Sequence, residues 1–279
     1  EAGALLHVRC LGEFVVTSGD RAISASDDEG ASYKAWEILA FLAAQPGGAV
    51  SKEKLITAIW PDIEPGRAAN RGRVAMARLP ALLARQVPGL SSEVVRCERD
   101  GTCRLDTKLV WSDAQEFLKL CQAGAKLPPS EATVALEQAR ELYRGDLLSG
   151  RGTRFYEWVE DRAESGISLR EHFREEFYQA TLRLARLYRA EGQVTLAVSL
   201  YKCLLRAEPT LEDIVRELYR CYQQLGDLSS LRRQDRDLRQ ALREAYLDPE
   251  YPEDDSHFDQ PEPETVALFN EIRSELEAQ

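Results

Sequence analysis

The chain of 279 residues is acidic, with 36 Lys plus Arg against 47 Asp plus Glu and a formal net charge of −11. A hydrophobic content of 44% and a charged content of 30% are typical of a folded, soluble chain, and the length predicts two domains. The acidity argues at first against nucleic acid as a partner, because phosphate binding needs positive charge. It does not say where along the chain the charges lie.

The sequence shows the pattern of neither a membrane protein nor a metalloprotein. Its longest apolar run, residues 38–44, is far shorter than the roughly 18–20 residues of a membrane span. The N-terminus lacks the features of a signal peptide, and because Met76 is the only methionine, Glu1 is not expected to be the native start. Six cysteines and three histidines show no zinc-site spacing. We therefore expect a cytoplasmic protein without metal or cofactor.

The first 30 residues predict a small sheet. Leu6, Val8 and Cys10 alternate with more polar residues, a second β-prone run begins at Phe14, and turn signals lie at residue 12 and at 18–20. A polar break is expected at residues 26–30.

Three helices and a hairpin are predicted next. The helices span residues 33–45, 52–60 and 67 into the eighties; Ser51 suits the N-cap of the second, and prolines at 46 and 61 end the first two. Two short β-prone runs at 94–97 and 104–105 then bracket Asp100-Gly101, which is a strong hairpin signal. Cys97 and Cys103 flank that turn. We expect ordinary thiols there, and a pair formed under oxidation is the alternative.

Residues 114–246 predict helix almost throughout, with breaks at 124–130, 145–153, Gly192 and Gly226. Residues 248–264 hold eight acidic residues and no Lys or Arg, which indicates an extended or disordered loop. A last helix is expected at about 264–276. Counted separately, residues 1–115 carry a net charge of −1 and residues 116–279 a net charge of −10. The acidity therefore belongs to the helical half.

The helical half repeats with a period of 34 residues, which is the period of tetratricopeptide repeats. Gly192 and Gly226 lie one period apart, as do Tyr188 and Tyr222. Residues at the motif's packing positions are expected to lie in the core: Ala185, Tyr188, Ala197, Tyr201 and the helix-ending Pro209 in the first copy, and Leu218, Tyr222, Gly226 and Leu231 in the second. Asp235 replaces an aromatic residue in that second copy, and Ala135, Ala139 and Tyr143 resemble an earlier half-unit. Such arrays present a surface on which a protein or ligand can dock.

Residues 65–92 hold five arginines and no acidic residue, although about one residue in six of the whole chain is acidic. At 100° per residue, one face is apolar: Gly72, Ala75, Met76, Leu79, Leu82, Leu83 and Val87. The opposite face carries small residues flanked by Asn and Arg, which suits a helix that enters a major groove. A solvated Arg-rich helix without a DNA role is the alternative reading.

The order of the elements favours the DNA reading. Two helices, a turn, a basic helix and a basic hairpin form the order of a winged helix-turn-helix. We expect the hairpin to reach the DNA backbone or minor groove, and Lys52 and Lys54 to contact phosphate together with the amides at their helix start. The predicted DNA-contacting residues are Lys52, Lys54, Arg67, Asn70, Arg71, Arg73, Val74, Ala77, Arg78, Arg96, Arg99 and Arg104.

Several segments resemble a known family. Tyr33-Lys-Ala-Trp-Glu-Ile-Leu, Val50-Ser-Lys-Glu-Lys-Leu-Ile and Arg67-Ala-Ala-Asn-Arg-Gly-Arg-Val are similar to the OmpR-like winged helix of SARP-type transcriptional activators. Ala135-Leu-Glu-Gln-Ala-Arg-Glu-Leu-Tyr, Trp158-Val-Glu-Asp-Arg and Ala207-Glu-Pro-Thr resemble the bacterial transcriptional activation domain that follows in that family. The resemblance covers about residues 5–275.

The resemblance implies an α+β winged helix-turn-helix with a small β-sheet at residues 1–113, followed by an all-α tetratricopeptide-like domain at 114–279. It implies a bacterial regulator that binds direct repeats in double-stranded DNA, as a dimer or as side-by-side protomers, and that helps to recruit RNA polymerase. It also implies that Asn70, Arg71, Arg73, Val74, Ala77 and Arg78 read the DNA. Two residues depart from the family pattern: Gly72 replaces a bulky apolar residue, and Pro80 is expected to kink or end the helix.

Those departures leave a second hypothesis open, a ligand- or protein-binding sensor module with a degenerate winged helix, part of a larger regulator. An enzyme is not expected, because no Gly-x-Ser-x-Gly, phosphate-binding loop or His-Glu-x-x-His motif is present.

Overall fold

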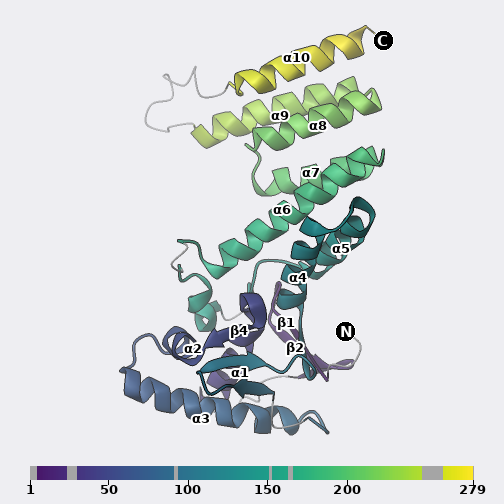
Figure 1. Ribbon diagram of the computed structural model, residues 1–279. Helices are drawn as coiled ribbons and strands as arrows, with labels where there is room; N and C mark the ends of the chain where they lie inside the picture. The colour runs from purple at the N-terminus through teal and green to yellow at the C-terminus, as the bar shows by residue number, and fades with distance from the viewer. Residues whose placement is uncertain are drawn as a thin grey trace. The chain divides into compact units, whose positions relative to one another are not determined.

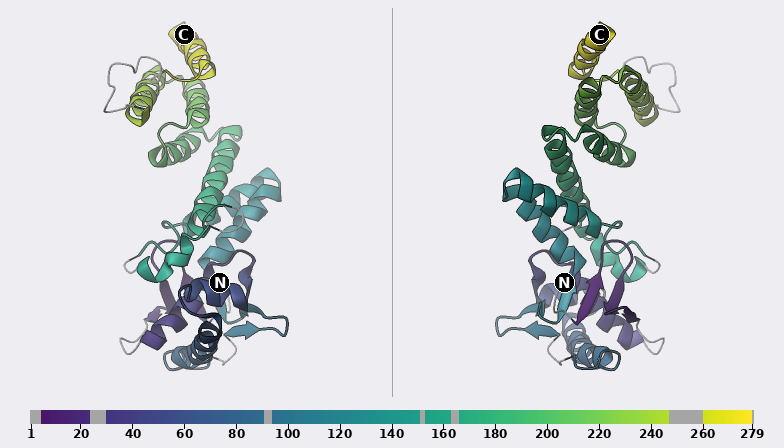
Figure 2. Two further views of the ribbon diagram at one scale, coloured as in Figure 1. Left: turned by 90° about the vertical axis from the view of Figure 1, so that its left-hand side faces the viewer. Right: turned by 90° about the vertical axis from the view of Figure 1, so that its right-hand side faces the viewer.

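The computed structural model describes residues 5–23, 30–90, 94–150, 153–162, 166–246 and 260–278. Its contacts divide the chain into two compact units (Figures 1 and 2): residues 1–126 with 137–177, here called unit 1, and residues 127–136 with 178–279, here called unit 2. This division by contacts does not test the predicted domain boundary at 113, which stays a prediction. Most of the polar break at 26–30 and of the acidic stretch at 248–264 lies outside the described residues.

Unit 1 opens with a four-stranded sheet in the order β3-β2-β1-β7. The strands β1 (Leu6–Arg9), β2 (Val15–Ser18) and β3 (Arg21–Ile23) form the antiparallel meander that the alternation predicts. The fourth strand, β7 (Val110–Ser112), pairs in parallel with β1 and was not predicted. A strand about 100 residues away in the sequence thus completes the N-terminal sheet.

Asp113 joins this sheet to the following helix, α4 (Asp113–Lys126). Its carboxylate accepts the backbone N–H of Cys10 at 2.6 Å and that of Leu11 at 3.2 Å, just beyond the end of β1. The side chain is buried, and so are Cys10 and Leu11. One carboxylate therefore supplies the acceptors for two buried backbone donors.

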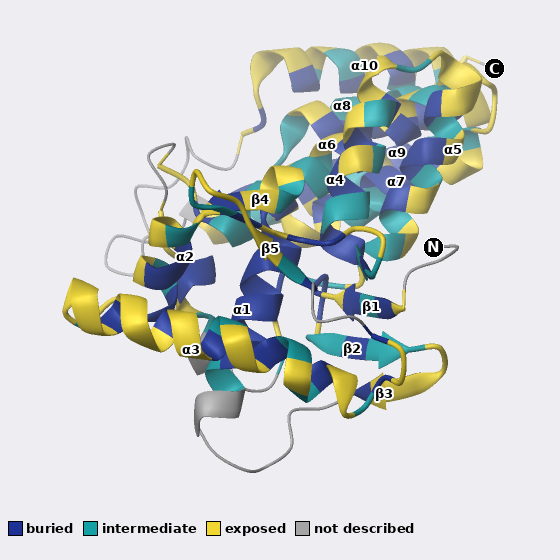
Figure 3. Cartoon of the chain, turned by 60° about the horizontal axis from the view of Figure 1, so that its bottom comes forward, coloured by how far each residue is buried: buried dark blue, intermediate teal, exposed yellow. Residues whose placement is uncertain are grey.

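Three helices pack beside the sheet: α1 (Gly30–Ala44), α2 (Lys52–Ile59) and α3 (Pro65–Ala84). They match the predicted helices, and Ser51 caps α2 by accepting the N–H of Lys54 at 3.2 Å. Helix α1 is the core element, since residues 35–44 are buried on all sides, including Trp36 and Phe41 (Figure 3). Helix α3 instead alternates buried and exposed residues, as an amphipathic helix does.

Unit 1 also contains a second sheet, in the order β4-β6-β5. The hairpin of β5 (Val95–Cys97) and β6 (Thr102–Leu105) turns at Asp100-Gly101 as predicted, with Gly101 at φ +84°. Strand β4 (Ala49–Ser51), after the short 3-10 helix η1 (Pro46–Gly48), adds a strand that was not predicted. The expectation of ordinary thiols was wrong: Cys97 and Cys103 face each other across the ladder and are joined by a disulfide.

The helical half is less regular than predicted. Helices α5 (Pro129–Leu142) and α6 (Leu169–Ala190) are present, but the described residues between them, 143–150, 153–162 and 166–168, form irregular turns and one 3-10 helix, η2 (Thr153–Val159). In this segment Leu147 forms an isolated antiparallel β-bridge with Leu11, and the Leu148 backbone N–H donates to the Cys10 carbonyl. The segment therefore completes unit 1 along the end of β1, and its apolar residues serve that packing.

Unit 2 contains the end of α6 and then α7 (Val194–Ala207), α8 (Glu212–Leu225), α9 (Leu228–Tyr246) and α10 (Pro263–Glu277). The helix pairs follow the predicted 34-residue period, and Gly192 and Gly226 both end helices at positive φ. The packing residues expected in the core within the helices are buried in the structure: Ala185, Tyr188, Ala197, Tyr201, Leu218, Tyr222 and Leu231. The same expectation was wrong for Pro209 and Gly226, which are exposed because they lie in the turns that follow α7 and α8. Asp235 is buried too, where it accepts the Tyr219 hydroxyl at 3.2 Å and pairs with Arg239 at 2.9 Å. No described helix combines the length and apolar character needed to cross a bilayer.

Candidate nucleic-acid interface

Helix α3 begins two residues earlier than the sequence indicates, because Glu64 caps it. The Glu64 carboxylate accepts the backbone N–H groups of Gly66 and Arg67, both at 3.0 Å, and these hydrogen bonds hold the pKa of the carboxyl below its usual value. Pro65 occupies the first helical position, where its missing N–H is no loss. The pattern Glu-Pro before an acid-free run was the available sequence signal for this start.

The two faces of α3 lie as predicted. Ala68, Gly72, Ala75, Leu79 and Leu83 are buried. The predicted DNA-contacting residues of this helix are all exposed: Arg67, Asn70, Arg71, Arg73, Val74, Ala77 and Arg78. The structure therefore brings these seven side chains onto one outward surface, here called the α3 surface, while their contact with DNA stays a prediction.

The two departures from the family pattern do not interrupt this helix. A Cβ atom added at Gly72 would lie 2.9 Å from Ile56 Cγ1 and 3.4 Å from the ring of Trp60, so the absent side chain lets α3 approach α2 closely. Pro80 was expected to kink or end the helix, and it does not end it, since α3 continues to Ala84. Pro80 lies in the last turns, where it removes a single backbone hydrogen bond.

The charges of the α3 surface are largely unneutralised. Arg73 donates to Asn70 Oδ1 at 2.9 Å, which fixes both side chains side by side. Among the described residues, Arg67, Arg71 and Arg78 have no carboxylate partner, and residues 65–92 contain no acidic residue at all. A positive surface without internal ion pairs is suited to attract phosphate groups.

A hollow of about 320 Å³ borders the α3 surface. It is lined by Asn70, Arg71, Val74, Ala75 and Arg78 of α3 and by Lys34 and Trp60. Lys34 was not predicted as a site residue; its ammonium donates to the Ile59 carbonyl at 2.9 Å, pairs with Glu37 at 2.7 Å and lies over the Trp60 ring. Lys34 thus lies at this edge with its charge already paired to Glu37, and a single Lys at a helix start gives no sequence signal for that position.

The hairpin contributes less free charge than predicted. Arg96 pairs with the buried Asp106 at 2.6 Å, and Arg104 pairs with Glu98. Only Arg99, at the exposed tip, has no ion-pair partner among the described residues. Of the three predicted hairpin arginines, Arg99 is therefore the one whose charge is fully available to a ligand.

The start of α2 is also partly engaged. The Lys52 amide donates to the Gly101 carbonyl of the hairpin at 2.8 Å, and the Lys54 amide donates to Ser51. Two of the amides expected to contact phosphate therefore donate within the protein, and contact of Lys52 and Lys54 with phosphate stays a prediction. The Lys54 side chain lines a large cavity of about 780 Å³ together with Phe41, Trp158 and His172, rather than joining the hollow beside α3.

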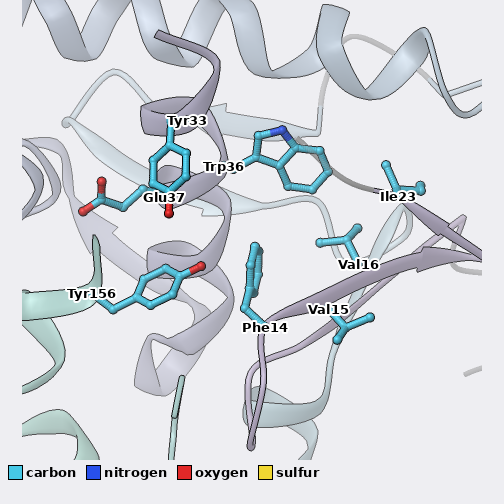
Figure 4. Close-up of a pocket in the computed structure, with 8 residues that line it drawn as sticks. All are labelled: Phe14, Val15, Val16, Ile23, Tyr33, Trp36, Glu37 and Tyr156. Atoms are coloured by element: carbon cyan, nitrogen blue, oxygen red, sulfur yellow. The ribbon is translucent and has the colours of Figure 1, made fainter. Parts of the chain in front are cut away.

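A smaller hollow of about 240 Å³ lies among β2, β3, α1 and Tyr156 (Figure 4). Its wall is mostly aromatic: Phe14 lies edge-on to both Trp36 and Tyr156, and the hydroxyl groups of Tyr33 and Tyr156 point toward the same space. Burial raises the pKa of the Glu37 carboxyl, which is already paired with Lys34. No residue of α3 lines this hollow, so it takes no part in the α3 surface.

Within the described residues, no group of three or more His, Cys, Asp or Glu is placed to hold a metal ion. No curated protein matches the sequence of this chain. The family model described as the bacterial transcriptional activator domain matches residues 112–252. Among solved structures, the chain is similar to Mycobacterium tuberculosis EmbR in complex with a low-affinity phosphopeptide, with a TM-score of 0.66 and 19% identity. The match covers 97% of this chain and 65% of that one, and at this identity it shows the fold alone.

Proposed function

Because the chain belongs to the family that carries the bacterial transcriptional activator domain, we propose that it activates transcription by binding specific DNA through a winged helix-turn-helix in unit 1. In this proposal α3 enters the major groove and the β5–β6 hairpin is the wing. Residues 112–252 act in activation, by contact with RNA polymerase, and protomers bind direct repeats side by side. The proposed setting is the cytoplasm, and the protein is not an enzyme.

One observation carries the proposal: the exposed face of α3 combines unpaired arginines with Asn70 and with small residues. Arg can donate two hydrogen bonds to guanine, Asn can pair with adenine, and Ala or Val can contact a thymine methyl group. Small residues such as Ala77 let the helix backbone approach the bases closely. Arg99 at the hairpin tip supports binding to the neighbouring backbone. Gly72 and Pro80, the reason for the sensor alternative, fit an uninterrupted α3.

The DNA part of the proposal is tested in two steps. Bound sequences are first selected from random double-stranded DNA with the purified chain. Affinity for the selected site is then measured by gel shift for the wild type and for the Arg73→Ala/Arg78→Ala variant. We expect a loss of at least about 30-fold, since each of the two lost base contacts costs about 1–3 kcal/mol, and a steep decrease of wild-type affinity with salt.

The matched control is Arg206→Ala/Arg236→Ala, which removes the same charge at exposed positions of α7 and α9. It should bind the selected site within about 2-fold of the wild type, as exposed charges outside the DNA contact are screened by salt. Equal affinity of the wild type and the Arg73→Ala/Arg78→Ala variant, or selection of no sequence at low salt, would contradict the proposal.

A further inference from the structure

Unit 2 carries a compact group of positive charges, here called the arginine cluster: Arg186 and Arg189 of α6 and Arg220 of α8. All three guanidinium groups surround one carboxylate, that of Glu217, at nitrogen–oxygen distances of 3.9, 3.2 and 3.5 Å. The Glu217 side chain is only 13% exposed, whereas those of Arg186 and Arg220 are 54% and 43% exposed. Three positive charges thus face one negative charge, and two remain unbalanced.

Most donors of the arginine cluster are unused by Glu217. A guanidinium group has five N–H donors, and a carboxylate at 3.5 or 3.9 Å lies beyond ordinary hydrogen-bond distance. Arg186 and Arg220 therefore hold their charge near Glu217 while presenting donors to solvent. Such donors bind a second carboxylate well, because guanidinium and carboxylate can form two parallel hydrogen bonds.

The surroundings select the kind of partner. Residues 178–190 of α6 contain three arginines and no acidic residue, although residues 116–279 as a whole carry a net charge of −10. A long polyanion such as nucleic acid would meet repulsion beyond the cluster, whereas a short acidic segment can place its carboxylates on the cluster alone. Helical repeats commonly receive extended segments of other proteins along such helix faces.

We propose that the arginine cluster binds an acidic, extended segment of a partner protein. Carboxylates of that segment accept hydrogen bonds from Arg186 and Arg220. This interaction does not depend on DNA binding by α3. Its failure and the failure of the proposed function are therefore separate results.

The test uses the full chain and a fluorescein-labelled dodecamer of glutamate, with binding followed by fluorescence anisotropy. We expect Arg186→Glu/Arg220→Glu to weaken binding at least about 10-fold, because it replaces attraction by repulsion at the site. The control Arg206→Glu/Arg236→Glu changes net charge equally at exposed positions of α7 and α9, and should weaken binding less than about 3-fold. Because the two charge-reversal variants change the net charge equally, comparing them cancels long-range charge effects, including attraction of the peptide by the α3 surface.

A milder variant tests the geometry without charge reversal. Arg186→Lys/Arg220→Lys keeps both charges but loses the paired donors, and we expect about a 3-fold loss of glutamate binding. Helix content measured by circular dichroism identifies any variant that fails to fold.

Three outcomes would overturn the proposal. The first is equal loss of glutamate binding in the two charge-reversal variants. The second is wild-type glutamate binding in Arg186→Lys/Arg220→Lys. The third uses a fluorescein-labelled dodecamer of thymidylate: a greater loss of its binding in Arg186→Glu/Arg220→Glu than in Arg206→Glu/Arg236→Glu would make the cluster a nucleic-acid site instead.

Discussion

Replacement of Asp113 by Ala is expected to lower the free energy of unfolding by about 4 kcal/mol, because the substitution leaves two buried backbone donors without an acceptor, each at a cost of about 1–3 kcal/mol. Those donors are the N–H groups of Cys10 and Leu11, which end β1 inside the core. The same carboxylate begins α4, so its loss affects the sheet and the helix together. Urea unfolding of the wild type and of Asp113→Ala measures the effect.

The control Asp113→Asn keeps one acceptor and removes the charge, and the difference between this variant and the wild type should depend on pH. Burial raises the pKa of Asp113 from 3.8 to about 6 in the folded protein. Between these two values the folded state binds more protons than the unfolded state, so stability from this group decreases as pH rises. The wild type should lose up to about 3 kcal/mol relative to Asp113→Asn between pH 4 and pH 7. A difference that stays constant over this range would contradict the proposed burial of an ionisable carboxyl.

Replacement of Gly72 by Leu, which restores the bulky residue of the family pattern, is expected to destabilise this protein by about 3 kcal/mol. A leucine must displace Ile56, since even its Cβ atom would lie 2.9 Å from Ile56 Cγ1, and overpacking a well-packed core costs about 1–3 kcal/mol or more. The same displacement should move α3 away from α2 and weaken DNA binding in a gel shift. Urea unfolding gives the change in stability.

A second substitution at the contact provides the control for Gly72. Ile56→Ala alone removes buried apolar volume and should be destabilising. Combined with Gly72→Leu, it makes room for the larger side chain, so we expect the double variant to be more stable than the sum of the single effects predicts. Strictly additive effects would show that Ile56 is not what excludes a side chain at position 72. The milder Gly72→Ala should change stability by less than about 1 kcal/mol, because improved helix propensity offsets the close contact.

Much of the fold follows from local sequence signals. The alternation at Leu6, Val8 and Cys10, the cap at Ser51 and the Asp100-Gly101 turn each act over a few residues, and each predicted element is present. The two faces of α3 follow from its 3.6-residue period alone. The 34-residue repeat likewise predicted which residues are buried in α6, α7 and α8.

The features that the sequence did not reveal depend on partners distant in the chain. Strand β7 is three residues long and is defined by its pairing with β1. The packing reason for Gly72 lies in Ile56 and Trp60, and the pairing of Arg96 depends on Asp106, so neither has a local pattern. The disulfide required the register that places Cys97 opposite Cys103. Charge counts could locate positive segments, but they could not show which arginines were already paired.

The parallel pairing of β1 with β7 has a consequence for the order of events during synthesis of the chain. The first strand leaves the ribosome about 100 residues before its parallel partner β7 exists, so the polar groups on one of its edges stay unpaired until residues 110–113 emerge. Unpaired strand edges are prone to association with other chains. A fragment cut at residue 109 would keep that edge permanently open, and should aggregate, whereas one that extends through residue 177 includes all of unit 1. Expression of the two fragments side by side, compared by the fraction that remains monomeric in gel filtration, would reveal this dependence directly.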